Sequence, residues 1–344
     1  MKALQTLVPS VIVFGMLVFF HELGHFVFAK ISDIKVNEFS LGFGPQILSI
    51  KSKETDYSIR ILPFGGYVKM EGEDSKTSNP RAFNNKPALT RLGVVLAGPV
   101  MNFILAILLL AIISFSSGIA TTQVTVIPGE PAQRAGIRSN DHIYAIDNQR
   151  VDSWDEVVDL ISKKPNEKIA VTVLRDGNYI KYIVDTAVEP ETQRGIIGIK
   201  TVVVKNSLSK SLKFGAQKTF WISKMILVGI SQMISGKVEV DVMGPLGLVH
   251  IVGEAAKIGA YQLLYIAAII SINLGLFNLF PIPALDGGRG VFLALELLRG
   301  KPIEPEKEGL IHFIGFALLM FLMVIVLFKD IRELDLIKRF WPNM

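Results

Sequence analysis

The sequence His21-Glu22-Leu23-Gly24-His25 lies inside an apolar run that begins near Leu7 and continues to Ala29. On a helix, residues four apart share a face, so the two imidazoles would lie one turn apart with the Glu22 carboxylate beside them. Hydrolytic zinc sites use this arrangement. Because ionisable side chains are costly in lipid, a His-Glu-His cluster inside a candidate membrane span indicates a functional site.

The composition is typical of a membrane protein. The chain has 344 residues, of which 50% are hydrophobic, and its mean hydropathy is +0.43. A net charge of +5 suits contact with an anionic membrane surface, whereas the absence of a basic stripe with interleaved aromatic residues argues against nucleic-acid binding. The chain has no cysteine, which excludes disulfides, cysteine-ligated metal and thiol catalysis.

Four apolar segments are long enough to cross a hydrocarbon core of roughly 30 Å. They are about Leu7–Ala29, Leu92–Ser114, Tyr261–Phe280 and Ile311–Phe328. The first could also be a signal peptide, but it is too long and lacks a clear cleavage site. A fifth candidate, Phe214–Ile234, is interrupted by lysine and glutamine, so we expect an amphipathic helix on the membrane surface, with five spans as the alternative.

These segments divide the chain into regions. Basic residues after the first and third spans place both loops in the cytoplasm, so the block around 121–205 and both termini would be extracytoplasmic. The predicted regions are a first span (1–30), a cytoplasmic-side loop (31–91), a second span (92–116), a globular domain (121–205), an extracytoplasmic amphipathic helical segment (206–258), a third span (259–290), a fourth span (308–329) and a tail (330–344).

Two polar regions carry strand patterns. In the first loop, Val36–Leu41, Gln46–Ser52 and Thr55–Leu62 alternate partly, and residues 63–70 follow, which predicts hairpins with an apolar edge. In the later block, strands are predicted at 142–146, 169–174 and 179–183. A helix is predicted at 153–162, with Ser153 as its N-cap and Glu156 three residues on.

A catalytic zinc usually takes three protein ligands and keeps one position for water. The third ligand is predicted to be Asp286, in Asn278-Leu-Phe-Pro281-Ile-Pro283-Ala-Leu-Asp286-Gly287-Gly288. The two prolines break the helix, and irregular backbone at membrane depth is tolerated only where protein buries it or water reaches it. The alternative is a simple turn at a helix end; the presence of His21 and His25 favours the ligand.

Glu22 is placed to take a proton from the attacking water and pass it to the leaving amine. His25 is five residues before Lys30, or about 7.5 Å along a helix, so the site would lie near the cytoplasmic edge. Asn102 is expected to hydrogen-bond between helices. For Asn278, a hydrogen bond to the substrate carbonyl and an interhelical hydrogen bond remain open.

The order of these motifs resembles the site-2 proteases, intramembrane zinc metalloproteases of the RseP type. The matching features are His21-Glu22-x-x-His25, Gly98-Pro99-x-x-Asn102, a PDZ-like block, and Asn278-x-x-Pro281-x-Pro283-x-Leu285-Asp286-Gly287. The resemblance implies zinc bound by His21, His25 and Asp286, with Glu22 as the base. It also implies a multi-pass protein of the bacterial cytoplasmic membrane whose active site faces the cytoplasm. Its substrates would be single-span proteins, such as trimmed anti-sigma factors or remnant signal peptides.

The first loop resembles the membrane-dipping β-hairpin region of the same family. Its edge could hold an unwound substrate by strand addition. The resulting candidates for substrate binding or oxyanion stabilisation are Gly42, Gly44, Gly65, Gly66, Asn102 and Asn278.

The later block resembles a PDZ domain through Pro131-Ala132-x-x-Ala135-Gly136-Ile137 and Asp141-x-Ile143. Asn140 stands where a glycine is usual, and a left-handed turn tolerates asparagine. RseP-type enzymes usually have two such blocks. The block either binds a peptide or excludes large ectodomains.

The predicted fold is therefore a monomeric, polytopic α-helical membrane protein with about four spans, a membrane-associated β-hairpin region and one extracytoplasmic PDZ-like α/β domain. The alternative function is a non-proteolytic membrane scaffold with a peptide-binding module, which would need a degraded metal site. A transporter would need repeated halves, and the sequence shows none.

Overall fold

The computed structural model describes residues 2–73, 77–238 and 243–333. The chain forms two compact units. The first unit contains Met1–Ala111 and Leu212–Met344, and the second contains Ile112–Ser211. The predicted C-terminal tail, from residue 334 onward, lies outside the described residues.

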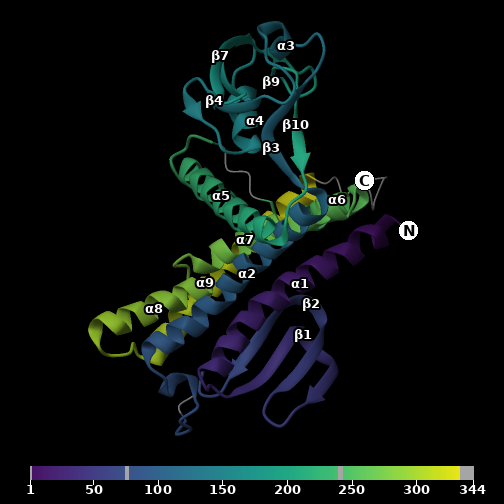
Figure 1. Cartoon of the computed structure of the whole chain (residues 1–344). Coiled ribbons are helices and arrows are strands. Elements are labelled where there is room, and N and C mark those ends of the chain that lie inside the picture. The colour runs from purple at the N-terminus through teal and green to yellow at the C-terminus, as the bar shows by residue number, and fades with distance from the viewer. Residues whose placement is uncertain (1, 74–76, 239–242, 334–344) are drawn as a thin grey trace. The chain divides into compact units, whose positions relative to one another are not determined.

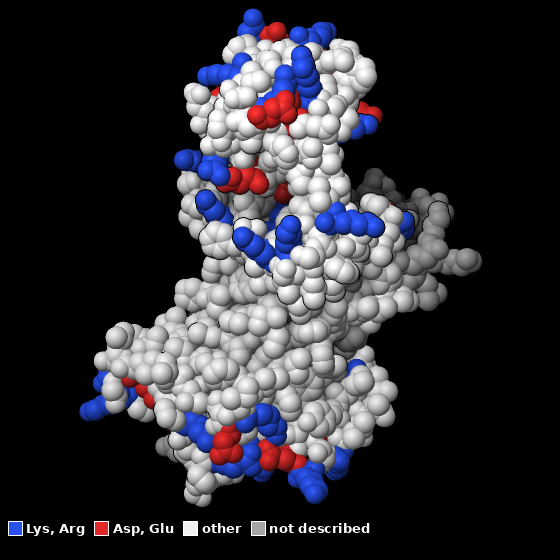
Figure 2. Space-filling view, viewed as in Figure 1, with Lys and Arg blue, Asp and Glu red and all other residues white. Residues whose placement is uncertain are grey.

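Long apolar helices build the first unit (Figure 1). They are α1 (Lys2–Ile31), α2 (Ala88–Ser117), α7 (Ala260–Leu279) and α9 (Pro305–Glu333). Within the described residues, these four helices are long and apolar enough to cross a membrane. Three of them contain a whole predicted span, and α7 ends at Leu279, one residue before the predicted end of the third. Figure 2 shows charged side chains at the lower end of this unit and at the level of α5 (Leu208–Ile234), with few between them.

Three other helices belong wholly or mostly to this unit. They are α5 (Leu208–Ile234), α6 (Pro245–Ile258) and α8 (Asp286–Arg299). Helix α5 covers the segment that we predicted as an amphipathic surface helix. The described part of 206–258 contains two helices, α5 and α6, and α8 was not predicted at all.

A curled hairpin packs against α1. It consists of β1 (Val36–Lys51) and β2 (Asp56–Met70), which are antiparallel, and a short 3-10 helix, η1 (Phe83–Asn85), follows. Residues 38–41 of β1 pair with 66–69 on one side and with 56–59 on the other. The segment 66–70 is therefore an edge, since its described strand pairing is with β1 alone.

A buried cluster joins the hairpin base to α1, α2 and α8. Its members are the apolar residues Ala29, Ile34, Val36, Phe39, Val68, Met70, Phe83, Val94, Val95 and Leu293. This cluster fixes the loop 31–91 against the helices that carry the predicted site.

The second unit is a small α/β domain. Its antiparallel sheet has the strand order β10-β3-β4-β6-β7, and β5 pairs with β4. The strands are β3 (Ile119–Val126), β4 (His142–Ile146), β5 (Gln149–Arg150), β6 (Lys168–Arg175), β7 (Asn178–Asp185) and β10 (Ile199–Val204). A separate pair, β8 (Ala187–Val188) and β9 (Gly195–Ile196), and the helices α3 (Pro131–Ala135) and α4 (Trp154–Ser162) complete the unit.

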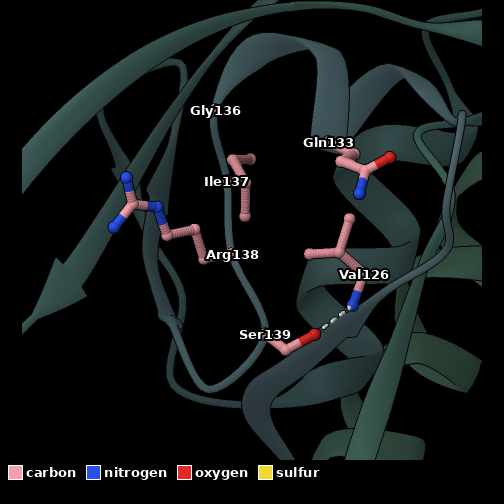
Figure 3. Close-up of a pocket in the computed structure, with 6 residues that line it drawn as sticks. All are labelled: Val126, Gln133, Gly136, Ile137, Arg138 and Ser139. Atoms are coloured by element: carbon pink, nitrogen blue, oxygen red, sulfur yellow. Dashed lines mark hydrogen bonds between the residues drawn. The ribbon is translucent and has the colours of Figure 1, made fainter.

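The local predictions for this unit agree with the structure. The predicted strands correspond to β4, β6 and β7, and the Ser153 hydroxyl caps α4 by accepting from the Glu156 N–H at 3.3 Å. Asn140 adopts φ of +75°, as expected for a left-handed turn. A cavity of about 380 Å³ beside α3 is lined by Val126, Gln133, Gly136, Ile137, Arg138 and Ser139, with Arg138 pointing away from it (Figure 3).

Candidate metal centre

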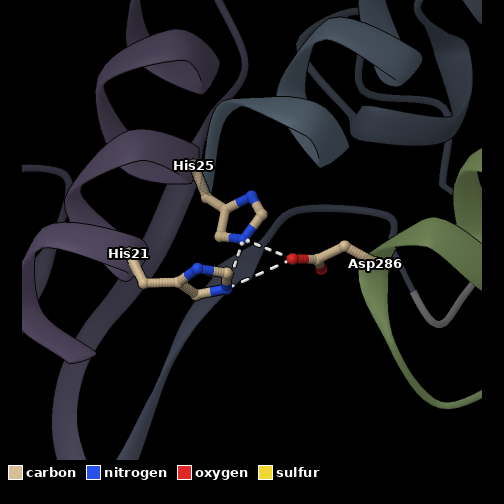
Figure 4. A group of neighbouring side chains, drawn as sticks. All are labelled: His21, His25 and Asp286. Atoms are coloured by element: carbon tan, nitrogen blue, oxygen red, sulfur yellow. Dashed lines mark hydrogen bonds and ion pairs between the residues drawn. The ribbon is translucent and has the colours of Figure 1, made fainter. Parts of the chain in front are cut away.

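Three predicted ligands meet at one point, although Asp286 is 261 residues from His25 in sequence. His21 and His25 lie one turn apart on α1, and their Nε2 atoms are 3.3 Å apart. Asp286 is the first residue of α8, and its Oδ2 lies 3.2 Å from His21 Nε2 and 3.4 Å from His25 Nε2 (Figure 4).

The spacing of these donors suits a tetrahedral zinc ion. Donor atoms about 2.05 Å from a tetrahedral ion lie about 3.3 Å from one another, and the three observed separations are 3.2 to 3.4 Å. Asp286 Oδ2 is buried and accepts no hydrogen bond within the described part of the chain. Two imidazoles and one carboxylate are also the ligand types of many catalytic zinc sites.

Backbone and side-chain groups orient both imidazole rings. His25 Nδ1 lies 2.8 Å from the Val94 carbonyl oxygen, so Nδ1–H can donate to this oxygen and leave the Nε2 lone pair directed at the centre. The Asn102 amide lies 3.0 Å from His21 Nδ1. Asn102 Oδ1 is buried and has no hydrogen-bond partner among the residues that the structure describes, and a half turn of the amide would let it accept from a protonated Nδ1.

Asn102 is itself fixed by α7. Ser271 and Asn102 are both fully buried, and the Ser271 hydroxyl donates to the Asn102 carbonyl oxygen at 2.8 Å. This chain of contacts runs from α7 through α2 to His21 on α1. The sequence suggested an interhelical hydrogen bond for Asn102, and the structure shows the ring of His21 beside its amide; a role in oxyanion binding stays a prediction.

Close packing of α1 and α2 brings Asn102 and Val94 to the histidines. A Cβ on Gly98 of α2 would overlap His25 Nε2 and would lie 2.9 Å from His21 Cε1. A Cβ on Gly24 of α1 would overlap the Ala97 carbonyl. Glycine at these two positions therefore allows the approach that orients the rings.

The Glu22 side chain extends from α1 to the hairpin edge. A Cβ on Gly66 of β2 would lie 2.9 Å from Glu22 Cγ and 2.8 Å from the Ser40 carbonyl oxygen. Gly66 is thus the predicted substrate-binding residue that the structure places directly against the predicted base. Gly42, Gly44 and Gly65 adopt positive φ within the hairpin, a backbone conformation that favours glycine over residues with a Cβ.

The loop from Phe280 to Leu285 presents Asp286. It turns tightly, since the Ile282 N–H donates to the Phe280 carbonyl at 2.7 Å and the Leu285 N–H to the Ile282 carbonyl at 3.1 Å. The break between α7 and α8 confirms the prediction that the helix is interrupted at the two prolines. Asn278 lies in the last turn of α7, and its predicted role is untested.

Two ion pairs that were not predicted join α8 to other parts of the first unit. Arg289 pairs with Glu73, which follows β2, and Arg91 of α2 pairs with Glu296. These pairs tie the first and third turns of α8 to separate elements. Arg289 follows Asp286 by three residues and so shares its helix face, which was the available signal.

Comparisons with known proteins match nearly the whole chain. The model of peptidase family M50 matches residues 9–322. A protein of Clostridium acetobutylicum is 41% identical over 328 residues, which cover 94% of this chain and 97% of that protein. The zinc metalloprotease RasP of Geobacillus kaustophilus and the regulator of sigma-W protease RasP of Bacillus subtilis are each 33% identical, covering 96% of this chain and 99% of each relative.

Among solved structures, the PDZ domain of an SdrC-like protein from Listeria monocytogenes is 20% identical. The match covers 25% of this chain and 88% of that structure, with a TM-score of 0.22. The family match spans both the His-Glu-His helix and the Asp286 loop. The chain therefore belongs to peptidase family M50, the family of the zinc metalloproteases that it matches.

Proposed function

We propose that this protein is an intramembrane zinc metalloprotease that hydrolyses peptide bonds within the transmembrane segments of single-span membrane proteins. The observation that carries this proposal is the convergence of His21, His25 and Asp286 on helices of membrane-spanning length, with Glu22 beside them. A scaffold without catalytic activity would not need these donors to converge.

In the proposed reaction, zinc would activate the carbonyl and the water, and groups of the protein would transfer the proton and orient the ligands. Zinc held by His21, His25 and Asp286 would act as a Lewis acid toward the scissile carbonyl and lower the pKa of water. Glu22 takes a proton from the attacking water and delivers it to the leaving amine nitrogen. Val94 and Asn102 keep the two imidazoles oriented throughout.

The edge of the hairpin suggests how substrate is held. A peptide bond inside a helix is shielded by its neighbours, so the substrate must be extended before hydrolysis. The segment Gly66–Met70 is an edge that starts beside Glu22, and an extended substrate could pair with it by strand addition. This pairing would align the scissile bond with the metal centre.

The outer part of the hairpin suits contact with lipid. Its exposed residues are predominantly large and apolar, and include Phe43, Ile47, Leu48, Ile50, Ile59, Ile61 and Leu62. Large exposed apolar patches mark interaction surfaces. We infer that the hairpin enters the membrane, where an unwinding transmembrane helix would meet its edge.

The charges near the end of α1 support a site close to the cytoplasmic face. Lys30 and Arg81 both pair with Glu54. Hydrogen bonds from Arg81 and Lys30 lower the pKa of Glu54 to about 2, so this carboxylate is ionised at neutral pH. Such a charged cluster belongs at a membrane surface, and Lys30 is just over one turn beyond His25.

Anti-sigma factors and remnant signal peptides are the proposed substrates. One relative is named a regulator of sigma-W protease, which fits the first class. We place the second unit, as a PDZ-like domain, outside the bacterial cytoplasmic membrane, where it would bind a peptide or exclude large ectodomains.

The test uses a single-span reporter and the full-length enzyme in proteoliposomes. Wild-type enzyme should cut the reporter within its apolar segment, at a bond identified by mass spectrometry. Glu22→Gln should bind zinc like the wild type yet cleave at least about 100-fold more slowly, because the proton acceptor is lost. Glu191→Gln, an exposed carboxylate in the second unit, is the control. Undiminished cleavage by Glu22→Gln would contradict the proposed mechanism.

A further inference from the structure

His312 of the fourth apolar helix contacts the loop that presents Asp286. Its Nδ1 accepts a hydrogen bond of 2.9 Å from the backbone N–H of Ala284, two residues before Asp286. Ala284 has φ of +77°, a left-handed conformation that residues with a Cβ rarely adopt. Such a conformation persists only where its surroundings hold it, and the His312 ring supplies one of these contacts.

A second contact joins the same helix face to the same loop. Gly315 lies three residues after His312, and so on the same face of α9. A Cβ on Gly315 would lie 2.6 Å from the Pro283 carbonyl oxygen, so the loop rests directly on the helix backbone. The Phe292 ring of α8 also packs against the His312 ring, with centroids 5.5 Å apart.

The other ring nitrogen indicates why a histidine stands here. Because Nδ1 accepts a hydrogen bond, Nε2 carries the proton of a neutral ring. Nε2 is buried and has no hydrogen-bond partner within the described residues; Glu308 Oε1 is 4.0 Å away. Burying a polar atom without a hydrogen bond is unfavourable, and a phenylalanine ring would fill the same space without burying a polar atom. The useful feature of His312 is therefore its Nδ1 acceptor.

We propose that His312 is a positioning residue that fixes the backbone at Ala284 and thereby sets where the Asp286 carboxylate lies relative to His21 and His25. This inference rests on the metal centre proposed above. Loss of the acceptor lets the loop relax, and the Asp286 donor then leaves its position about 3 Å from the two ring nitrogens. The result is weaker zinc binding, although His312 does not touch the metal.

The experiment compares two substitutions in the full chain in detergent micelles. His312→Phe keeps the ring but removes the acceptor, whereas His312→Asn places an amide oxygen close to where Nδ1 lies. Zinc affinity is measured by competition with a chromophoric chelator, and hydrogen exchange of residues 282–286 is measured on the metal-free protein. We expect His312→Phe to bind zinc roughly 10-fold more weakly and to exchange faster, and His312→Asn to reverse most of both effects.

Two further variants make the outcomes distinguishable. His250→Phe, at an exposed position on α6, should behave like the wild type. Asp286→Ala should lose more zinc affinity than any His312 variant. Wild-type affinity in His312→Phe, or affinity in His312→Asn as weak as in His312→Phe, would overturn this inference alone. Wild-type affinity in Asp286→Ala would overturn the metal centre itself.

If His312→Phe does not fold, His312→Gln replaces it in the comparison with His312→Asn. The two amides are chemically alike, but the glutamine reaches the position of Nε2 rather than that of Nδ1. We expect His312→Asn to bind zinc more tightly than His312→Gln, and equal affinities of the two variants would overturn the proposal.

Discussion

At the scale of single residues, Gly98 determines how closely α2 approaches the proposed metal ligands His21 and His25. A methyl group there would overlap His25 Nε2, which is a donor atom, and would crowd the His21 ring. The resulting shift would also weaken the contacts of Val94 with His25 and of Asn102 with His21. The Gly-Pro-x-x-Asn motif thus supports the proposed metal centre from a neighbouring helix.

We expect Gly98→Ala to lower zinc affinity by about 10-fold or more, because it displaces a donor atom and the groups that orient it. The measurement is chelator competition with the full chain. Gly15→Ala is the matched control, since it lies within α1 and its added Cβ would meet nothing within 4 Å. Equal zinc affinity in Gly98→Ala and the wild type would show that the helices can separate without cost to the site.

The residues of the candidate site differ in how readily the sequence predicted them. His21, Glu22 and His25 could be predicted because helical spacing alone places them on one face. Asp286 required a second signal, the prolines that end the third span. For Asn102 the sequence predicted an interhelical hydrogen bond but not that its partner is the His21 ring. The contact of His312 was not predicted, because its partner is a backbone N–H on another element.

At the scale of elements, the long apolar helices were predictable from length and composition, and the structure contains all four. Helix α8 was missed because it begins Asp-Gly-Gly, and glycine is a poor helix former. The curl of the hairpin, in which residues 38–41 pair on both sides, was also missed, because it depends on register shifts that no alternation pattern encodes. That curl creates the edge beside Glu22.

In the second unit, a buried ion pair links the beginning of β4 to the end of β6. The Arg175 guanidinium donates to both carboxylate oxygens of Asp141 at 2.7 Å, and the Arg138 N–H donates to Oδ2 at 2.8 Å. Burial alone would raise the pKa of Asp141, but the hydrogen bonds from Arg175 and Arg138 outweigh it and hold this pKa below its ordinary value of 3.8. Asp141 is only 2% exposed, so the pair is well shielded from solvent.

This lowered pKa predicts a pH dependence for the second unit. The folded carboxyl binds a proton less readily than the unfolded one, so the pair stabilises the unit fully above about pH 4 and progressively less as pH falls through the folded pKa. At pH 7, Asp141→Asn should destabilise the unit by about 3 kcal/mol, because Arg175 keeps its charge without its partner. The difference in the free energy of unfolding between Asp141→Asn and the wild type should become smaller below pH 4.

Unfolding by guanidinium chloride can be followed through Trp154 of α4, in a chain whose other two tryptophans are replaced by phenylalanine. Lys168→Gln is a suitable control, because its ion pair with Asp185 is exposed. Identical stability of Asp141→Asn and the wild type at pH 7 would contradict the stabilising role of the pair.

At the scale of the whole molecule, the family match confirms the predicted zinc-dependent peptidase, and the apolar helices agree with a multi-pass membrane protein. The side of the membrane on which the second unit lies, the number of spans and the substrate remain predictions. The sequence predicted the zinc chemistry more fully than the membrane topology. The spacing of metal ligands is a local feature, whereas orientation in the membrane depends on charges spread over several loops.

The most direct test of the account is zinc K-edge X-ray absorption on the purified full-length protein. We predict nitrogen and oxygen ligands only, with outer-shell scattering from two imidazoles. The spectrum should be unchanged in Glu22→Gln and altered in Asp286→Ala, because Asp286 is a proposed ligand and Glu22 is not. A spectrum without imidazole scattering, or one that Asp286→Ala leaves unchanged, would contradict the central claim that His21, His25 and Asp286 hold the metal.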